Sequence, residues 1–202
     1  MATSRVKTSS ILQGFPKSRS VLAGNAAYEP GSYYSIATTT LGSNQTTITF
    51  SSIPATFTHL QLRIFARTNR TSQSFANLLI RFNNDTGSNY AYHDLFADGA
   101  SATASGTATQ TSIIANRLTG AGATASIFGA IVVDVLDYTS TNKNKTVRTL
   151  GGVDLNGSGA LSYSSGLYFA TPAAINRIDL TTIAGTFDFV QYSEFALYGI
   201  KA

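Results

Sequence analysis

The chain lacks cysteine and tryptophan and has few charged residues. Without cysteine, disulfide bonds and thiolate metal sites are excluded from its 202 residues. Charged side chains make up 12%, about half the share of an average soluble domain. Serine, threonine, asparagine and glycine must therefore cover most of the surface. Such a surface suits a protein that packs against copies of itself or against other proteins.

Long apolar runs are also missing. The longest, residues 127–133, is far shorter than the roughly 20 residues that a membrane helix needs, and Gly129 interrupts it. After Arg5 and Lys7 there is no continuous apolar block, so no secretory signal peptide is expected. We therefore expect no membrane insertion.

The net charge of +4 is concentrated at one end of the chain. Residues 1–28 contain Arg5, Lys7, Lys17 and Arg19 and no acidic residue, so the remaining ten basic and ten acidic side chains cancel. A protein that binds nucleic acid usually carries its basic residues on a folded face, and the neutral remainder offers none. Nucleic acid is not an expected partner.

Short alternating segments with polar or glycine-rich connections dominate from residue 33 onward. In residues 59–67, for example, Leu60, Leu62 and Ile64 alternate with polar residues, as in a half-buried strand. This pattern predicts an all-β fold over residues 33–202, an antiparallel jelly-roll-like β-sandwich of about ten strands. The expected strands cover residues 35–40, 46–50, 59–67, 77–83, 90–96, 111–117, 126–138, 145–150, 161–170, 175–182 and 192–200.

Two connections are predicted to be loops with a potential for binding. The segment 97–110 is of low complexity and consists mostly of residues with small side chains, and the segment 151–160 is rich in glycine. Loops on a rigid sandwich commonly carry binding functions.

The segment 126–138 is predicted to be one long strand with near-continuous burial, bent at Gly129.

Residues 1–32 predict an extended docking arm rather than a strand or helix. Glycine and proline interrupt any regular element, yet large apolar residues recur at irregular intervals. Apolar side chains that cannot form their own core need another surface, which favours an arm that binds other proteins over a solvated tail. The docking residues we expect are Ile11, Leu12, Phe15, Val21, Leu22 and Tyr28.

The segments GFPKSRSVLAGNAAYEPGSY and TITFSSIPATFTHLQLRIFAR resemble virion proteins of tailed bacteriophages, including phages of cyanobacteria and other aquatic bacteria. The similarity continues through LLIRFNNDTGSNYAYHDLFADG and SIFGAIVVDVLDYTSTNKNKTVRTLGGVDLNGSG to FALYGIK, and so covers nearly the whole chain. Members of this group are described as tail-fibre or virion structural proteins. The resemblance implies a structural protein of the virion, assembled in the bacterial cytoplasm and homo-oligomeric, with a trimer as the expected state.

Two structural roles are compatible with this resemblance. The first is a tail or baseplate fibre, anchored by its N-terminal arm, whose β domain contacts the host surface. The alternative is a capsid decoration protein that reinforces the phage head. Both roles require docking, so the arm does not distinguish them.

No catalytic or metal site is expected, and no cofactor. His93 and Asp94 are adjacent on a predicted strand and therefore point to opposite faces, so they cannot form a dyad directly. His93 is interpreted as partly buried and structural. The loop DLNGSG (residues 154–159) lacks the acidic residue that would close a calcium site and is interpreted as a Gly/Asn turn. The loop NNDTGSN (residues 83–89) is interpreted as an Asx-type turn. The chain is not expected to be an enzyme.

Four residues are candidates for contact with a host-surface glycan. Tyr90 and Tyr92 share one face of a predicted strand and offer aromatic rings for sugars. Arg63 and Arg67 lie four residues apart on another and could bind an acidic sugar. The alternative for the arginines is a solvated sheet face.

Overall fold

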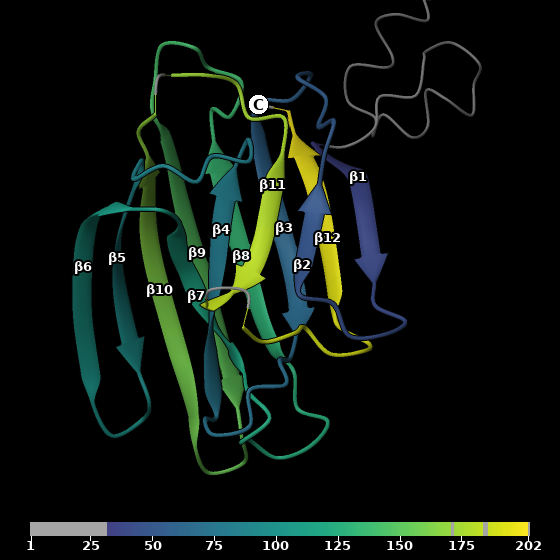
Figure 1. Cartoon of the computed structure of the whole chain (residues 1–202), viewed down its shortest axis with the longest axis vertical. Helices are drawn as coiled ribbons and strands as arrows, with labels where there is room; N and C mark the ends of the chain where they lie inside the picture. Colours follow the sequence, from purple (N-terminus) through teal and green to yellow (C-terminus); the bar gives the residue numbers. More distant parts are fainter. Residues whose placement is uncertain (1–31, 171, 184–185, 202) are drawn as a thin grey trace, which may run out of the picture. The chain divides into compact units, whose positions relative to one another are not determined.

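A computed structural model of the chain describes residues 32–170, 172–183 and 186–201. Residues 33–202 form one compact unit built from two antiparallel β-sheets, of eight and four strands, packed as a β-sandwich (Figure 1). The predicted all-β fold is therefore confirmed. No helix in the described part of the chain is long and apolar enough to cross a membrane. The predicted arm, with its six docking residues, lies outside the described residues.

The described residues contain twelve strands, two more than the ten or so predicted. They are β1 (Tyr33–Thr40), β2 (Thr47–Phe50), β3 (His59–Ala66), β4 (Phe75–Phe82), β5 (Tyr90–Ala97), β6 (Ala102–Gln110), β7 (Ile113–Thr119), β8 (Gly129–Leu136), β9 (Lys145–Asp154), β10 (Gly159–Tyr168), β11 (Ile178–Thr182) and β12 (Glu194–Ile200).

Eight of the strands form a jelly roll. Strand β1 pairs with β12 and β3 with β8 in one sheet, while β2 pairs with β11 and β4 with β7 in the other. The first framework strand thus pairs with the last, the second with the second-last, and so on inward. The sheet orders β1-β12-β3-β8 and β2-β11-β4-β7 are those of a rolled-up antiparallel ribbon, the jelly-roll arrangement.

The remaining four strands are two inserted hairpins. Hairpin β5–β6 follows β4, and hairpin β9–β10 follows β8. Both join the larger sheet beyond β8, in the order β8-β9-β10-β5-β6. In Figure 1 they extend this sheet to one side, and β6 is the outermost strand.

The structure corrects three predictions about local structure. Residues 102–110 form strand β6 rather than a loop, because Thr and Ala alternate and pair with β5. Most of the predicted 151–160 loop belongs to strands, because β9 continues to Asp154 and β10 begins at Gly159. They leave a tight turn in which Asn156 and Gly157 have positive φ and Leu155 N–H donates to Ser158 O. Strand β8 is shorter than predicted and alternates between buried and exposed residues.

Strands β1, β3, β8 and β12 enclose an apolar core with β2, β4 and β11. Leu62, Ile80 and Val133 are fully buried in it, and the rings of Phe189 and Phe195 meet edge to face with their centroids 4.9 Å apart. Burial of each such side chain contributes about 1.5–3 kcal/mol. This core accounts for the alternation that made the fold predictable.

The inserted side of the sandwich is more polar where β7 crosses β9 and β10. Asn116, which is buried, donates from Nδ2 to Thr149 Oγ1 and Ser162 O, at 3.2 and 3.1 Å. Ser164 Oγ donates to Ile114 O, at 2.9 Å. Small polar side chains allow β7 to lie close to the larger sheet, so here hydrogen bonds replace apolar contacts.

Candidate functional site

The four candidate glycan-contact residues do not form a surface site. Tyr90 is fully buried, and its hydroxyl donates to Phe82 O and Asp85 O and accepts from Phe82 N–H. Burial raises the pKa of Tyr90 to about 12. Tyr92 is partly buried against the core. The prediction that Tyr90 contacts a receptor is wrong, because its ring is part of the stack with Tyr168, 4.8 Å away.

Arg67 is also structural. It lies just past the end of β3 and is 8% exposed. Its guanidinium donates to three backbone carbonyls of the loop between β7 and β8, namely Ala123 O, Thr124 O and Ile127 O, at 2.8, 2.7 and 3.0 Å. Burial lowers its pKa. The predicted patch of Arg63 and Arg67 is therefore wrong for Arg67, whose side chain is used to hold this loop.

Arg63 alone keeps the predicted exposure. Its guanidinium carbon lies 5.7 Å from the ring centre of Tyr33 and 5.3 Å from that of Tyr198, within the range of cation–π contacts. Its Nε donates to Gln61 Oε1, at 3.1 Å. Strands β1, β3 and β12 thus place one arginine between two tyrosines on the outer face of the larger sheet.

One of the two histidines lies beside an acidic side chain: His59 Nδ1 is 3.6 Å from Asp137 Oδ1. Nδ1 of His59 accepts the backbone N–H of Asp137, at 2.9 Å. His93 is exposed rather than partly buried as predicted, and its ring covers Gly106 on β6, where a Cβ would lie 2.2 Å from it. Within the described residues, no three His, Asp or Glu side chains gather as metal ligands would.

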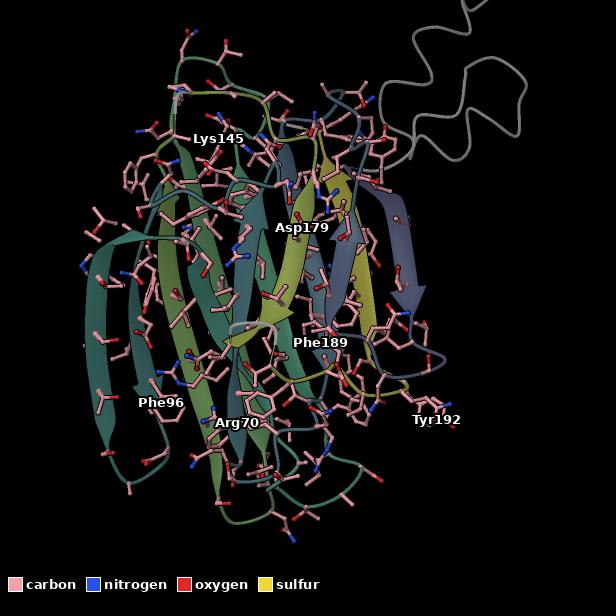
Figure 2. The ribbon with its side chains drawn as sticks, viewed as in Figure 1. Arg70, Phe96, Lys145, Asp179, Phe189 and Tyr192 are labelled. Atoms are coloured by element: carbon pink, nitrogen blue, oxygen red, sulfur yellow. The ribbon has the colours of Figure 1, made fainter. Side chains whose placement is uncertain are left out.

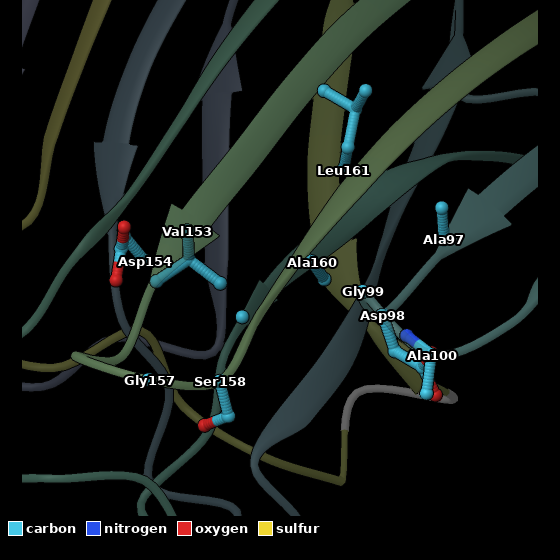
Figure 3. Close-up of a pocket in the computed structure, with 11 residues that line it drawn as sticks. Ala97, Asp98, Gly99, Ala100, Val153, Asp154, Gly157, Ser158, Ala160 and Leu161 are labelled. Carbon is cyan, nitrogen blue, oxygen red and sulfur yellow. The ribbon is translucent and has the colours of Figure 1, made fainter.

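A hollow of about 900 Å³ lies at the end of the sheet, between the β5–β6 and β9–β10 turns (Figure 3). Its two carboxylates lie on opposite sides of Ala160 in this view. Each is used by its own turn: Asp98 Oδ1 accepts from the N–H groups of Ala100 and Ser101, and Asp154 Oδ1 accepts from Asn156 N–H. Hydrogen bonds from Ser101 and Ala100 lower the pKa of Asp98. This arrangement is that of Asx-type turns, and the Gly/Asn turn predicted for residues 154–159 is confirmed by the positive φ of Asn156 and Gly157.

The most distinctive surface is a broad apolar area, which we term the outer apolar face. Six large side chains on neighbouring strands β3, β8, β9, β10 and β5 point away from the core, and each is between 37% and 58% exposed. The strand register places them in two adjacent rows. They are Phe65, Leu95, Val132, Leu150, Leu161 and Tyr163.

The outer apolar face has relief that could receive side chains of another protein. One hollow of about 470 Å³ lies among Phe65, Val132 and Leu150. A second, of about 360 Å³, lies beside Leu95 and Tyr163. Soluble proteins rarely expose wide apolar patches unless they bind a protein or a membrane there.

Strand β10 explains why the sequence did not reveal this face. Two of its three serines, Ser162 and Ser164, point inward towards β7, whereas Leu161, Tyr163 and Leu167 point outward. A period-2 pattern identifies two faces but assigns the apolar one to the core. One signal in the sequence could have revealed this face. Ser162, Ser164 and Gly166 alternate along the strand, and side chains this small cannot fill an apolar core, so the apolar side chains between them could have been assigned to the surface.

Comparisons with protein-family models, curated proteins and solved structures found no match to this chain.

Asp85 fastens the loop between β4 and β5. Its carboxylate accepts hydrogen bonds from Gly87 N–H, Asn89 Nδ2 and the Tyr168 hydroxyl, at 2.7, 2.9 and 3.0 Å. Burial acts to raise its pKa, but these hydrogen bonds outweigh burial and leave the pKa below that of an ordinary aspartate. The predicted Asx-type turn of residues 83–89 is confirmed.

Asp85 should contribute to acid sensitivity. Since its folded pKa lies below the unfolded value of about 3.9, its stabilising effect is complete at neutral pH and is lost as pH falls through the folded pKa. Asp85→Asn is expected to lower the unfolding free energy at neutral pH and to flatten its decline in acid. Urea titrations at pH 7 and pH 3 measure both effects. Parallel pH dependence in the wild type and the variant would contradict this prediction.

Proposed function

We propose that this chain is a structural protein of a bacteriophage particle, held there by contacts with other proteins rather than acting as an enzyme. The outer apolar face is the observation that carries the proposal, because its leucines and Phe65 suit a protein surface. The low share of charged residues and the resemblance to phage virion proteins support the same function.

The first role that we propose is a tail or baseplate fibre. In this role residues 1–32 anchor the chain and the β domain is presented towards the host. Arg63, flanked by Tyr33 and Tyr198, remains a candidate for contact with an acidic sugar, since a guanidinium binds a carboxylate and tyrosine rings stack on sugars.

The second role is a capsid decoration protein. The outer apolar face favours it, because aliphatic side chains offer a sugar few hydrogen bonds but offer another protein a large contact. A decoration protein is packed against its neighbours over much of its surface. This chain has a β domain without net charge, and that domain carries the outer apolar face.

Imaging of intact particles that carry a label on this chain tests the proposal. A fibre should be present in a few copies at the tail tip or baseplate, whereas a decoration protein should be present in hundreds of copies over the head. The variant Leu150→Glu/Leu161→Glu is expected to reduce incorporation at least tenfold without unfolding the protein, because both side chains are more than half exposed.

The matched control is Tyr192→Glu. Tyr192 is 69% exposed and lies in the connection before β12, where it points away from the domain (Figure 2). This variant should be incorporated like the wild type. A particle preparation that contains none of the chain would overturn the proposal, and equal incorporation of all three proteins would remove the outer apolar face from it.

A further inference from the structure

Strand β6 is an outer strand whose second edge is open. It pairs with β5 along Ala102–Gln110, and no other strand in the described part of the chain lies beside it (Figure 1). Every second residue of such a strand directs its N–H and C=O groups away from the sheet, where they can bind another strand.

Natural proteins usually protect such an edge, and β6 lacks the usual protection. Its nine residues, ATASGTATQ, include no charged residue and no proline. The stretch Ala102–Thr107 pairs regularly with β5, and the shift in register falls only beyond it. Lysine, proline or a short length would prevent further pairing, and none of these is present. The irregularity in β6 lies near its end, between Thr107 and Gln110, where Thr109 has positive φ.

The other outer strands differ from β6 in these respects. Strand β1 has its register shift between Ser35 and Ala37, within the strand. Strand β2 has only four residues, and β7 contains both a register shift in its pairing and Arg117. Of the four outer strands in the described residues, β6 is the longest, and its first six residues pair with β5 without a shift in register.

The sequence of β6 is nearly the same in both directions around Ser105. If two copies of β6 are placed antiparallel with Ser105 opposite Ser105, then Thr103 faces Thr107. Ala104 then faces Gly106, and Ala102 faces Ala108. Every facing pair is small or is a threonine pair, and cross-strand threonine pairs are favourable in antiparallel sheets. No like charges meet.

We propose that β6 is a dimerisation edge, at which two copies of this chain pair antiparallel about a two-fold axis through Ser105. The paired edges make one continuous sheet from the two eight-stranded sheets. A second copy fits this edge better than an unrelated strand. Because the sequence is nearly palindromic, a two-fold axis through Ser105 brings matching small side chains together on both sides of the axis.

The neighbouring side chains hold the edge in position for this pairing. Ser105 Oγ donates to Asp94 Oδ1, and Asp94 is bound by Arg117 Nη2, at 2.9 Å. On the opposite face, the His93 ring lies over Gly106. The strand is therefore ordered before it meets a partner, which reduces the entropy cost of association.

The pairing also joins the two outer apolar faces. Leu95 on β5 faces Ala104 on β6, so the row that contains Leu95 and Tyr163 continues to the edge. In the dimer this row would continue into the row of the second copy that contains Gly106 and His93, directly beside that copy's own Leu95 row. The resulting two-fold pair differs from the trimer that the phage resemblance implies.

A single introduced cysteine tests the axis in the full-length chain, which has no cysteine of its own. Ser105→Cys places two thiols opposite each other, within the separation that a disulfide can bridge after slight adjustment. Mild oxidation is expected to convert most of the protein into a covalent dimer on a non-reducing gel. Asp94 retains Arg117 in this variant, so the fold should persist, and circular dichroism checks it.

Ala102→Cys is the matched control. Ala102 is also exposed and lies on the same strand, but in the proposed dimer it faces Ala108 rather than its own symmetry copy. It should cross-link at least tenfold less than Ser105→Cys. Equal cross-linking of the two variants, or none in either, would overturn the proposed axis.

Charge substitutions at the facing threonines give a second test, in which the molar mass of the protein in solution distinguishes monomer from dimer. Thr103→Lys/Thr107→Lys places lysine opposite lysine twice and is expected to yield monomers. Thr103→Lys/Thr107→Glu places opposite charges across the same axis and should restore the dimer. A wild type that is monomeric or trimeric at high concentration, or a second variant no more associated than the first, would overturn the proposal.

Discussion

Arg67→Leu is expected to lower the unfolding free energy by about 3–5 kcal/mol, since it removes a buried cation that holds three carbonyl groups. Arg63→Leu, four residues earlier, should cost less than about 1 kcal/mol because that side chain is exposed. Urea or thermal unfolding followed by circular dichroism measures both. In a domain of this size the first change corresponds to a loss of roughly 10 °C in melting temperature.

Arg67→Lys separates charge from geometry. A lysine keeps the positive charge but cannot present a planar fork to Ala123, Thr124 and Ile127 at once, so an intermediate loss is expected. Faster hydrogen exchange should be confined to residues near the loop between β7 and β8. If Arg67→Leu and Arg63→Leu destabilise the protein equally, Arg67 does not act as the fastener of that loop.

These two arginines also mark how far the sequence could be interpreted. The alternation in residues 59–66 correctly predicted strand β3, because inward leucines build the core. The same alternation placed Arg63 and Arg67 together on one surface. That inference fails where β3 ends at Ala66, since beyond this point the loop between β7 and β8 surrounds the side chain. The alternation of apolar and polar residues shows which face of a strand a side chain lies on. It does not show which loop packs against the residues just past the end of the strand.

The jelly-roll class was predictable for a similar reason, and so were three of the four strands of the inserted hairpins, whereas residues 102–110 of β6 were predicted to be a loop. Framework strands such as β3 and β12 alternate around one apolar core. Strand β6 has no large apolar side chain, and β10 turns Ser162 and Ser164 inward and its leucines outward. In both strands, pairing with β5 determines the structure, and such long-range pairing leaves little signal in local sequence. The proposed dimerisation edge lies on the first insertion, and the outer apolar face extends from β3 and β8 across both insertions.

The ion pair of Asp94 and Arg117 is expected to have the other large effect on stability. It links β5 to β7, and the two side chains are 4% and 23% exposed respectively. Arg117 also donates to Asn77 Oδ1 and lies over the ring of Phe96, 4.8 Å from its centre; Figure 2 shows Phe96 near the end of β5. Arg117→Met should cost about 3–5 kcal/mol, because it leaves a buried carboxylate without its cation.

The double variant Arg117→Met/Asp94→Asn makes this prediction specific. If the loss comes from the unpaired charge, removing that charge should recover about 1–3 kcal/mol of the stability lost in Arg117→Met. Additive losses would instead mean that packing against Phe96 causes the effect. Lys143→Ala is the surface control, since its ammonium, 2.6 Å from Asp137, is 68% exposed and its removal should leave the unfolding midpoint unchanged.

The same pair connects the stability of the fold to the proposed edge. Asp94 receives a hydrogen bond from Ser105, so loss of Arg117 should loosen β6 before it unfolds the framework strands. In Arg117→Met, amide exchange is therefore expected to increase first in β5 and β6, and dimer formation should weaken in parallel. A variant that is destabilised throughout but dimerises as tightly as the wild type would show that the order of β6 does not depend on Asp94.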